Sequence, residues 1–129
     1  MDLNFYNKMD DFTLIPKDQI VFENNYFFMI YDAFPVSPGH ILIISKRLVP
    51  NYFELNEEEL VQLNHSIIKA KSLIDSTFNP IGYNIGMNCG PAAGQTVMHF
   101  HCHVIPRHKG DMADPRGGVR HAVEGRGYY

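Results

Sequence analysis

The sequence predicts an α+β fold, because one long helical segment accompanies several short strands that are joined largely by turns. The helical pattern spans residues 56–78, and the predicted strands lie between residues 20 and 106. At 129 residues the chain has room for one hydrophobic core and little else. We therefore predict a single domain over residues 1–129, with a polar N-terminal arm at 1–11 and a glycine- and arginine-rich tail at 112–129.

The first three predicted strands follow one another closely. Residues 20–23 and 27–32 are apolar runs on either side of an Asn-Asn pair, which is typical of a hairpin turn. Residues 33–39 contain two prolines and a glycine and are expected to form a loop. Residues 40–45 carry an uninterrupted run of four aliphatic side chains, which indicates a strand buried on both faces.

The long helix has a recognisable beginning and end. Asn56 is a good N-cap, and the three glutamates that follow it place negative charge in the first turn, where it is favoured. Apolar residues then recur at helical spacing to about Phe78, after which an Asn-Pro pair ends the segment. Two further strands are predicted after the helix, at residues 83–87 and 98–106.

The composition argues against several classes of function. The net charge is −3, from 11 basic and 14 acidic residues, whereas broad nucleic-acid binding needs a basic face. We expect neither a membrane span nor a signal peptide, because no apolar run is long enough and no basic region opens the chain. Cys102 falls on the predicted buried face of its strand, which favours a free thiol over a disulfide. Together these features predict a cytoplasmic protein.

Three alternating histidines are the most informative feature of the chain. His99, His101 and His103 lie on one predicted strand, where successive side chains point to opposite faces. The three imidazoles therefore share a face, with neighbours about 7 Å apart. A lone strand histidine is usually an ordinary surface residue, but three in alternation are costly as packing and useful as chemistry. The glycine-rich loop at 90–96 precedes them and can bring backbone amides close to an anion.

The residues alone leave two chemical interpretations of these histidines open. His-x-His on a strand can chelate zinc, but zinc sites usually add a carboxylate or a thiolate ligand. The sequence has no Cys-x-x-Cys pair and no carboxylate beside the histidines. The interpretation that we favour is a nucleophilic histidine flanked by two helpers. A neutral imidazole is a competent nucleophile near pH 7, and crowding disfavours charging all three at once.

The segment at residues 94–107 contains the pattern His-φ-His-φ-His-φ-φ, in which φ is apolar. It resembles the signature of the histidine triad family of nucleotide hydrolases and transferases. The Pro-Gly-His at the end of residues 35–40 is similar to a turn of that family, and residues 86–90 fall where the family places its phosphate-side loop. The resemblance covers about residues 12–111. It implies a HIT-like fold, with a five-stranded antiparallel sheet, a long helix and a shorter helix, and a homodimer.

The resemblance also implies a role for each histidine. His101 would attack the α-phosphate and form a nucleotidyl-histidine intermediate, while His99 orients it and His103 hydrogen-bonds the phosphate or the leaving oxygen. His40, from the Pro-Gly-His turn, would hold one of these imidazoles in the required tautomer. Asp32 matches the position that binds the ribose hydroxyls, although a carboxylate at a strand end can equally cap the loop that follows.

The resemblance also implies two groups of substrate contacts and a role for the tail. The loop residues expected to bind substrate are Asn88, Gly94, Gln95, Thr96 and Val97. The apolar slot for the base is expected from Phe12, Ile15 and Ile30, residue types that are also ordinary core. Because the family places a partner subunit next to the pocket, the tail at 112–129 is expected to reach a neighbouring active site.

We therefore predict a nucleotide hydrolase that cleaves at the α-phosphate of a purine nucleotide conjugate of the dinucleoside polyphosphate type. Residues 90–96 and 106–111 look like the fragile histidine triad branch, which cleaves such substrates, whereas Asp32 and Asn88 are shared with the nucleoside phosphoramidase branch. A phosphoramidase and a nucleotide-binding sensor without turnover are the alternatives. No metal site and no required cofactor are predicted, although a divalent metal that arrives with the substrate is compatible with the mechanism. The expected partners are a small nucleotide and a second copy of the chain, with no nucleic acid and no membrane.

Overall fold

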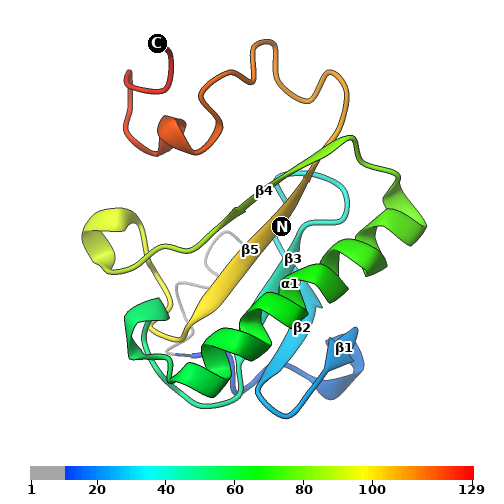
Figure 1. Ribbon diagram of the computed structural model, residues 1–129, viewed down its shortest axis with the longest axis vertical. Coiled ribbons are helices and arrows are strands. Elements are labelled where there is room, and N and C mark those ends of the chain that lie inside the picture. The colour runs from blue at the N-terminus through cyan, green and yellow to red at the C-terminus, as the bar shows by residue number, and fades with distance from the viewer. Residues whose placement is uncertain (1–10) are drawn as a thin grey trace.

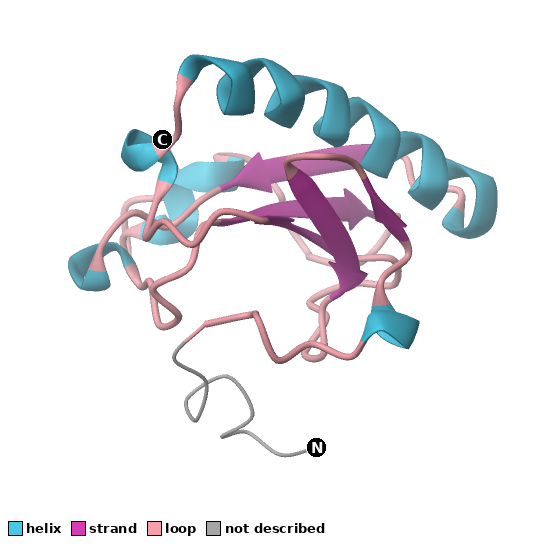
Figure 2. Cartoon of the chain, turned by 90° about the horizontal axis from the view of Figure 1, so that it is seen from below, coloured by secondary structure: helices cyan, strands magenta, loops and turns pink. Residues whose placement is uncertain are grey.

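A five-stranded antiparallel sheet and one long helix make up the core of the protein. The computed structural model describes residues 11–129, so nearly all of the predicted arm at 1–11 lies outside the described residues. The strands run in the order β1-β2-β3-β5-β4, and α1 crosses one face of the sheet while loops cover the other (Figure 1, Figure 2). The elements are β1 (Phe22–Glu23), β2 (Phe27–Tyr31), β3 (Ile41–Ser45), α1 (Glu57–Phe78), β4 (Gly82–Gly86) and β5 (His101–Arg107). The predicted α+β class is confirmed.

The N-terminal hairpin forms where the Asn-Asn pair predicts it. The side chain of Asn24 accepts hydrogen bonds from the backbone N–H groups of Tyr26 and Phe27, both at 2.8 Å, and so closes the turn between β1 and β2. Strand β3 then pairs with both β2 and β5, and each of its five residues is buried. The aliphatic run of β3 therefore forms the centre of the sheet, as its sequence predicts.

The helix α1 begins with the N-cap that the sequence predicts. The Asn56 side chain accepts a hydrogen bond from the Glu59 N–H, and Glu59 accepts one from the Asn56 N–H, both at 2.9 Å. The buried Glu59 carboxylate also forms an ion pair with Arg47 at 2.7 Å, which lowers the pKa of Glu59. The reciprocal cap satisfies the backbone N–H groups of Asn56 and Glu59, and Arg47 balances the buried charge of the Glu59 carboxylate. At the other end Asn79 takes a left-handed conformation, with φ of 50°, and ends the helix.

Two hydrophobic clusters lie on opposite faces of the sheet. The larger one fills the space between the sheet and α1, where Cys102 and Val104 of β5 point toward the helix. The smaller cluster lies on the other face and contains Phe12, Ile15, Ile30, Leu42, Ile44 and Val97. Burial raises the pKa of the Cys102 thiol to about 12, so it packs as a neutral free thiol, as predicted. The face opposite α1 is the one that carries His101 and His103.

Three details of the fold differ from the sequence prediction. Strand β5 begins at His101 rather than at Met98, because the chain from residue 97 to 99 bends before the strand starts. The expected shorter helix is absent as an α-helix from residues 11–129, where the other helical segments are 3-10 turns of three to five residues. The tail contains one of these turns, η5 (Gly118–Ala122), which contacts β4 of its own chain. Within the described residues, no helix is both long and apolar enough to cross a bilayer.

Candidate active site

Strand β5 separates its side chains into a core set and a site set. His101 and His103 pair across the sheet with Ile44 and Leu42 of β3 and share the face opposite α1. Both histidines are half-buried, while the intervening Cys102 is fully buried against the helix side. The alternation predicted from the sequence therefore holds for these two histidines, which lie 5.4 Å apart between ring centroids.

His99 does not join this row, because it lies before the strand begins. Its ring is fully buried, accepts a hydrogen bond from the Phe12 N–H at Nδ1 (3.0 Å), and contacts the carbonyl of Ser45 through Nε2 (2.6 Å). A carbonyl oxygen can only accept, so Nε2 carries the proton and the ring is neutral. His99 thus ties the N-terminal segment to the end of β3, and it reaches His101 through its backbone rather than through its ring.

His101 is held in a single tautomer by the backbone of His99. Its Nδ1 lies 2.8 Å from the His99 carbonyl oxygen, and since this oxygen accepts, Nδ1 must donate. The proton of the neutral ring is therefore on Nδ1, and the lone pair is on Nε2. Phe12 packs edge-on against the imidazole, with ring centroids 5.0 Å apart. The ring is thus oriented, neutral and available for nucleophilic attack through Nε2.

His103 takes the opposite tautomer because of His40. The Val36 N–H donates to His40 Nδ1 at 3.2 Å, which places the His40 proton on Nε2, 2.9 Å from His103 Nδ1. His103 Nδ1 must then accept, so its own proton is on Nε2. Asp32 Oδ2 lies 3.4 Å from His40 Nε2 and favours the same arrangement. One imidazole of the pair therefore presents a lone pair and the other presents an N–H group.

All four histidines are kept neutral chiefly by burial. Burial lowers the pKa of His40, His99 and His101, and lowers the pKa of His103 to about 4, with repulsion from His101 and His40 as smaller causes. The sequence suggested that crowding would keep the nucleophile neutral, and the structure assigns the larger part of the effect to burial. The neighbouring Asp32 opposes this shift at His40, His101 and His103.

Two cavities meet at His103. The smaller, about 190 Å³, contains His101 together with Phe12, Leu42, Gly94, Thr96 and Val97. The larger, about 510 Å³, contains His40 and the side chains and backbone of β4. The two cavities share four lining residues, which are Asp32, Phe34, Asn88 and His103. His101 therefore lines the smaller cavity together with the glycine-rich loop, and His103 lies between this cavity and the larger one.

The residues expected to bind substrate are divided between these cavities and the core. Asn88, Gly94, Thr96 and Val97 line the smaller cavity, as does Asp32, whose Oδ1 also accepts from the Phe34 N–H at 2.9 Å. The Gln95 side chain instead braces the loop, because it accepts from the Gly90 N–H and donates to the carbonyl of Val97. It lines neither cavity, in contrast to the predicted phosphate contact.

The expected base slot is mostly core in this structure. Ile15 and Ile30 belong to the smaller hydrophobic cluster, are at most 8% exposed and line neither of the two cavities at His103. Phe12 is equally buried but does line the smaller cavity beside His101. Of these three residues, Phe12 alone borders the space where a nucleotide would meet the histidines.

Among residues 11–129, one cluster has the donor atoms for a metal ion. Asp32, His40 and His103 each offer one such atom, and the three lie within 4.8 Å of one another. Two of these atoms, His40 Nε2 and His103 Nδ1, already share a hydrogen bond at 2.9 Å. The cluster is thus built as a hydrogen-bonded chain, and a metal ion would have to displace the shared proton.

Sequence reasoning missed the walls of the larger cavity. Asn84, Ile85 and Met87 come from β4 and its end, Ile105 comes from β5, and Gly118, Val119 and Ala122 come from η5. The first four lie on predicted strands, and of these only Met87 falls in a segment, residues 86–90, that the resemblance marks. The tail has no periodicity that places it beside β4, where η5 lines a cavity of its own chain. That the tail also reaches a neighbouring active site stays a prediction.

The comparisons with known proteins agree with this fold and identify the family. The HIT domain model matches residues 15–110, and the chain belongs to the histidine triad family. It is 42% identical over 80 residues to the asymmetrical bis(5′-nucleosyl)-tetraphosphatase of Schizosaccharomyces pombe, a match that covers 62% of this chain and 44% of that protein. It is 39% identical over 99 residues to the bis(5′-adenosyl)-triphosphatase of Dictyostelium discoideum, covering 77% and 66%.

Solved structures give the same result. A HIT family protein from Bacillus anthracis superposes with a TM-score of 0.71 at 33% identity, over 85% of this chain and 77% of that one. The Caenorhabditis elegans NitFhit protein gives a TM-score of 0.73 at 33% identity, over 84% of this chain and 26% of that one. The chain thus spans less than half of the Schizosaccharomyces relative and about a quarter of the NitFhit chain.

The buried neutral histidines predict a specific dependence of stability on pH. Below about pH 6.5 the unfolded chain protonates its histidines, while native His103 stays neutral until about pH 4. The unfolded state then binds more protons, so the free energy of unfolding falls as the pH falls, by about 1.4 kcal/mol per unit for each such histidine. Urea titrations at pH 7, 6, 5.5 and 5 measure this slope.

The matched variants for this measurement are His103→Asn and His65→Asn. His65 is exposed on α1, so its replacement should leave the slope as it is, whereas His103→Asn should make the slope shallower. A free energy of unfolding that stays constant from pH 7 to pH 5 would contradict the neutral, buried state of the site.

Proposed function

We propose that this protein is a nucleotide hydrolase that cleaves at the α-phosphate of a nucleotide conjugate through a nucleotidyl-histidine intermediate on His101. The observation that carries the proposal is the tautomer of His101, whose Nδ1 donates to the His99 carbonyl at 2.8 Å and leaves the Nε2 lone pair as the nucleophile. Burial lowers the pKa of this ring, so the nucleophile stays neutral at pH 7. A sensor that does not turn nucleotide over would not require this arrangement.

The reaction consists of two displacements at one phosphorus atom. In the first, His101 Nε2 bonds to the phosphorus, and the electron pair of the breaking bond goes to the leaving atom. His103, whose Nε2 carries a proton, donates a hydrogen bond that stabilises the charge developing there. In the second, water attacks the phosphorus, the electron pair of the P–N bond returns to His101, and a proton of the water passes to solvent. No step needs a bound metal ion or another cofactor.

The surrounding residues have positioning and binding roles in this proposal. His40 holds His103 in its donating tautomer and is itself held by the Val36 N–H. Asn88, Thr96 and the backbone at Gly94 line the cavity on the side where the phosphoryl oxygens would lie. Asp32 borders the same cavity and is proposed to accept hydrogen bonds from the ribose hydroxyls.

The substrate class follows from the relatives. Two of them are named as hydrolases of bis-nucleosyl polyphosphates, which supports a dinucleoside polyphosphate as the substrate of this chain. The chain is proposed to act as a homodimer, with β4 as an open sheet edge in the single chain. A nucleoside phosphoramidate is the second candidate, because attack by His101 yields the same intermediate whichever group leaves.

The test is to incubate the protein with diadenosine tetraphosphate and with adenosine 5′-phosphoramidate in parallel, each with and without EDTA. Release of AMP, resistant to EDTA, is the expected result for at least one substrate, and the ratio of kcat/KM values identifies the preferred class. Nucleotide binding with no release of AMP from either substrate would identify a sensor. Loss of activity in EDTA would instead show that a divalent metal takes part, bound either with the substrate or at Asp32, His40 and His103.

A further inference from the structure

Ser37 is a buried serine in the loop between β2 and β3, which leads into His40. It is 8% exposed and lines neither cavity at His103. Its hydroxyl donates to the carbonyl of Pro106 on β5 at 2.6 Å, across 69 positions of the chain. A buried hydrogen bond between such distant residues constrains the loop that carries the serine, because a shift of the loop would leave both polar groups unpaired.

The Pro106 carbonyl depends on this hydroxyl for a partner on the β3 side of the sheet. β3 begins opposite Val104, so in the described sheet it stops short of Pro106. The carbonyl after Pro106 accepts from the Ile81 N–H on the β4 side, and consecutive carbonyls of a strand point to opposite edges. The Ser37 hydroxyl therefore takes the place that a backbone N–H would fill if β3 began earlier.

The His40 backbone and the His40 ring are held by different contacts. The backbone is fixed by the sheet, because the His40 carbonyl accepts from the Asp32 N–H at 2.9 Å. The ring is fixed by the Val36 N–H, which donates to Nδ1 at 3.2 Å. The Val36 side chain is 70% exposed and gives the loop little anchorage. The position of this N–H therefore depends on the next residue, Ser37.

Ser37 is also the first residue of the turn that ends at His40. The His40 N–H donates to the Ser37 carbonyl at 3.2 Å, with Pro38 at the second position and Gly39 at the third. Gly39 has φ of 95°, as the third position of a type II turn requires. A β-carbon on Gly39 would lie 2.8 Å from a ring carbon of Phe78, so the turn packs directly against α1. What the Ser37 hydroxyl holds in place is therefore the segment before the turn.

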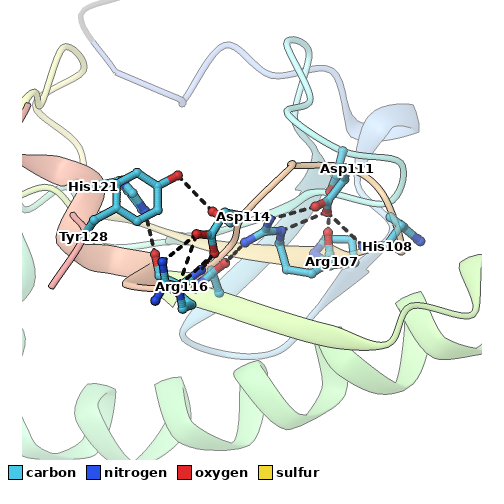
Figure 3. Close-up of polar contacts among 10 residues, drawn as sticks. Arg107, His108, Asp111, Asp114, Arg116, His121 and Tyr128 are labelled. Atoms are coloured by element: carbon cyan, nitrogen blue, oxygen red, sulfur yellow. Dashed lines mark hydrogen bonds and ion pairs between the residues drawn. The ribbon is translucent and has the colours of Figure 1, made fainter. Parts of the chain in front are cut away.

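Another hydrogen bond joins this loop to the residue after β5, but on an exposed side. His108 Nε2 donates to the Pro38 carbonyl at 3.0 Å. Asp111 holds this segment, because it forms an ion pair with Arg107 and accepts from the His108 N–H (Figure 3). Water competes with an exposed hydrogen bond and is excluded from a buried one. The larger constraint on the loop therefore comes from Ser37.

From these contacts we propose that Ser37 is a positioning residue of the site. Its hydroxyl keeps the Val36 N–H on His40 Nδ1, and the His40 proton therefore stays on Nε2. There the proton is donated to His103 Nδ1, which leaves the proton of His103 on its own Nε2. Without the Ser37 hydroxyl, the Val36 N–H is released and either nitrogen of His40 can carry the proton. The consequence for the reaction rests on the proposed function, whereas the effect on the proton does not.

The direct test observes the proton between His40 and His103 by ¹H–¹⁵N NMR of the imidazole nitrogens, in the protein without nucleotide. The His40 Nε2 proton is expected as a slowly exchanging signal, assigned by its absence from His40→Asn. Ser37→Ala should lose this signal through exchange with water. Ser37→Thr keeps the hydroxyl and should retain the signal.

A kinetic test separates positioning from a general loss of stability. Ser37→Ala should lower kcat for adenosine 5′-phosphoramidate by about three- to tenfold, the effect of losing one hydrogen bond. The p-nitrophenyl ester of AMP should be affected less, because its leaving group needs little help from His103. The matched control is Ser66→Ala, which removes another buried serine hydroxyl, one that accepts from Asn24 at 3.0 Å. This control should change neither the NMR signal nor the ratio of the two rates.

The positioning role would be overturned by a signal that is absent from wild-type protein, persists in Ser37→Ala, or is lost equally in Ser37→Thr or Ser66→Ala. Equal slowing of the two substrates by Ser37→Ala would also overturn it. If Ser37→Ala loses the signal but wild-type protein releases no AMP from either substrate, the positioning role stands and the proposed hydrolase activity fails.

Discussion

Replacement of His101 by alanine is expected to lower kcat by on the order of 10⁴-fold or more, while nucleotide still binds. The reason is that Nε2 of this ring supplies the electron pair for the bond to phosphorus, and no other side chain of the described site presents an equivalent lone pair. The lone pair of His99 is on Nδ1 and accepts a hydrogen bond from the Phe12 N–H, and the lone pair of His103 is on Nδ1 and accepts one from His40. The measurement is AMP release under single-turnover conditions, together with nucleotide binding by calorimetry.

His65→Ala is the control for this experiment. His65 lies exposed on α1, away from the cavities, so the variant should retain wild-type kcat. Mass spectrometry of wild-type enzyme quenched with denaturant at alkaline pH, where the P–N bond survives, should detect an adduct of one nucleotidyl group on the peptide that contains residues 101–103, and the His101→Ala protein should have none. Wild-type activity in the His101→Ala protein would rule out the covalent route.

Replacement of His103 by alanine is expected to lower kcat by about 10²–10³-fold for substrates whose leaving atom develops full negative charge. The effect follows from the loss of the Nε2–H donor that His40 orients. It should be much smaller for the p-nitrophenyl ester of AMP, because the nitrophenolate anion disperses its charge over the ring. Comparison of the two classes of substrate separates this role from a general structural role, which would affect both classes equally.

Two further proteins sharpen the test of His103. His103→Gln keeps an N–H donor of similar reach and should recover part of the loss, whereas His40→Ala should reproduce the dependence on the leaving group in weaker form. Thermal unfolding of each variant shows whether the fold is intact. If His103→Ala slows hydrolysis of the p-nitrophenyl ester of AMP and of adenosine 5′-phosphoramidate by the same factor, the His103 ring does not stabilise the leaving group.

The fold could be predicted largely from local signals. The Asn-Asn pair closes the β1–β2 hairpin through Asn24, the aliphatic run of β3 is buried throughout, and Asn56 and Glu59 form the cap that starts α1. Each of these features depends on residues within a few positions of one another. For the same reason, the ends of the elements are close to those expected from the sequence, except that β5 begins three residues later.

The site was only partly predictable, because its geometry depends on contacts between distant residues. The pattern at 99–103 locates the histidines of the candidate site, but it does not reveal that His99 leaves the row. That follows from its contacts with Phe12 and Ser45, which are 87 and 54 positions away. The bracing role of Gln95 depends on how the loop folds back on Gly90. The wall formed by η5 carries no sequence signal, since it packs on β4 without a polar contact.

The pairing of β5 on both sides limits how the chain can vary in length. His101 and His103 pair with β3, and β4 pairs along the other edge from His103 to Arg107. One residue inserted or deleted within this strand would reverse every side chain beyond it, turning a histidine toward α1 and a core residue such as Cys102 or Val104 toward the cavities. Insertions and deletions are therefore expected to be tolerated beyond residue 110 and to be absent from residues 101–107 in functional variants.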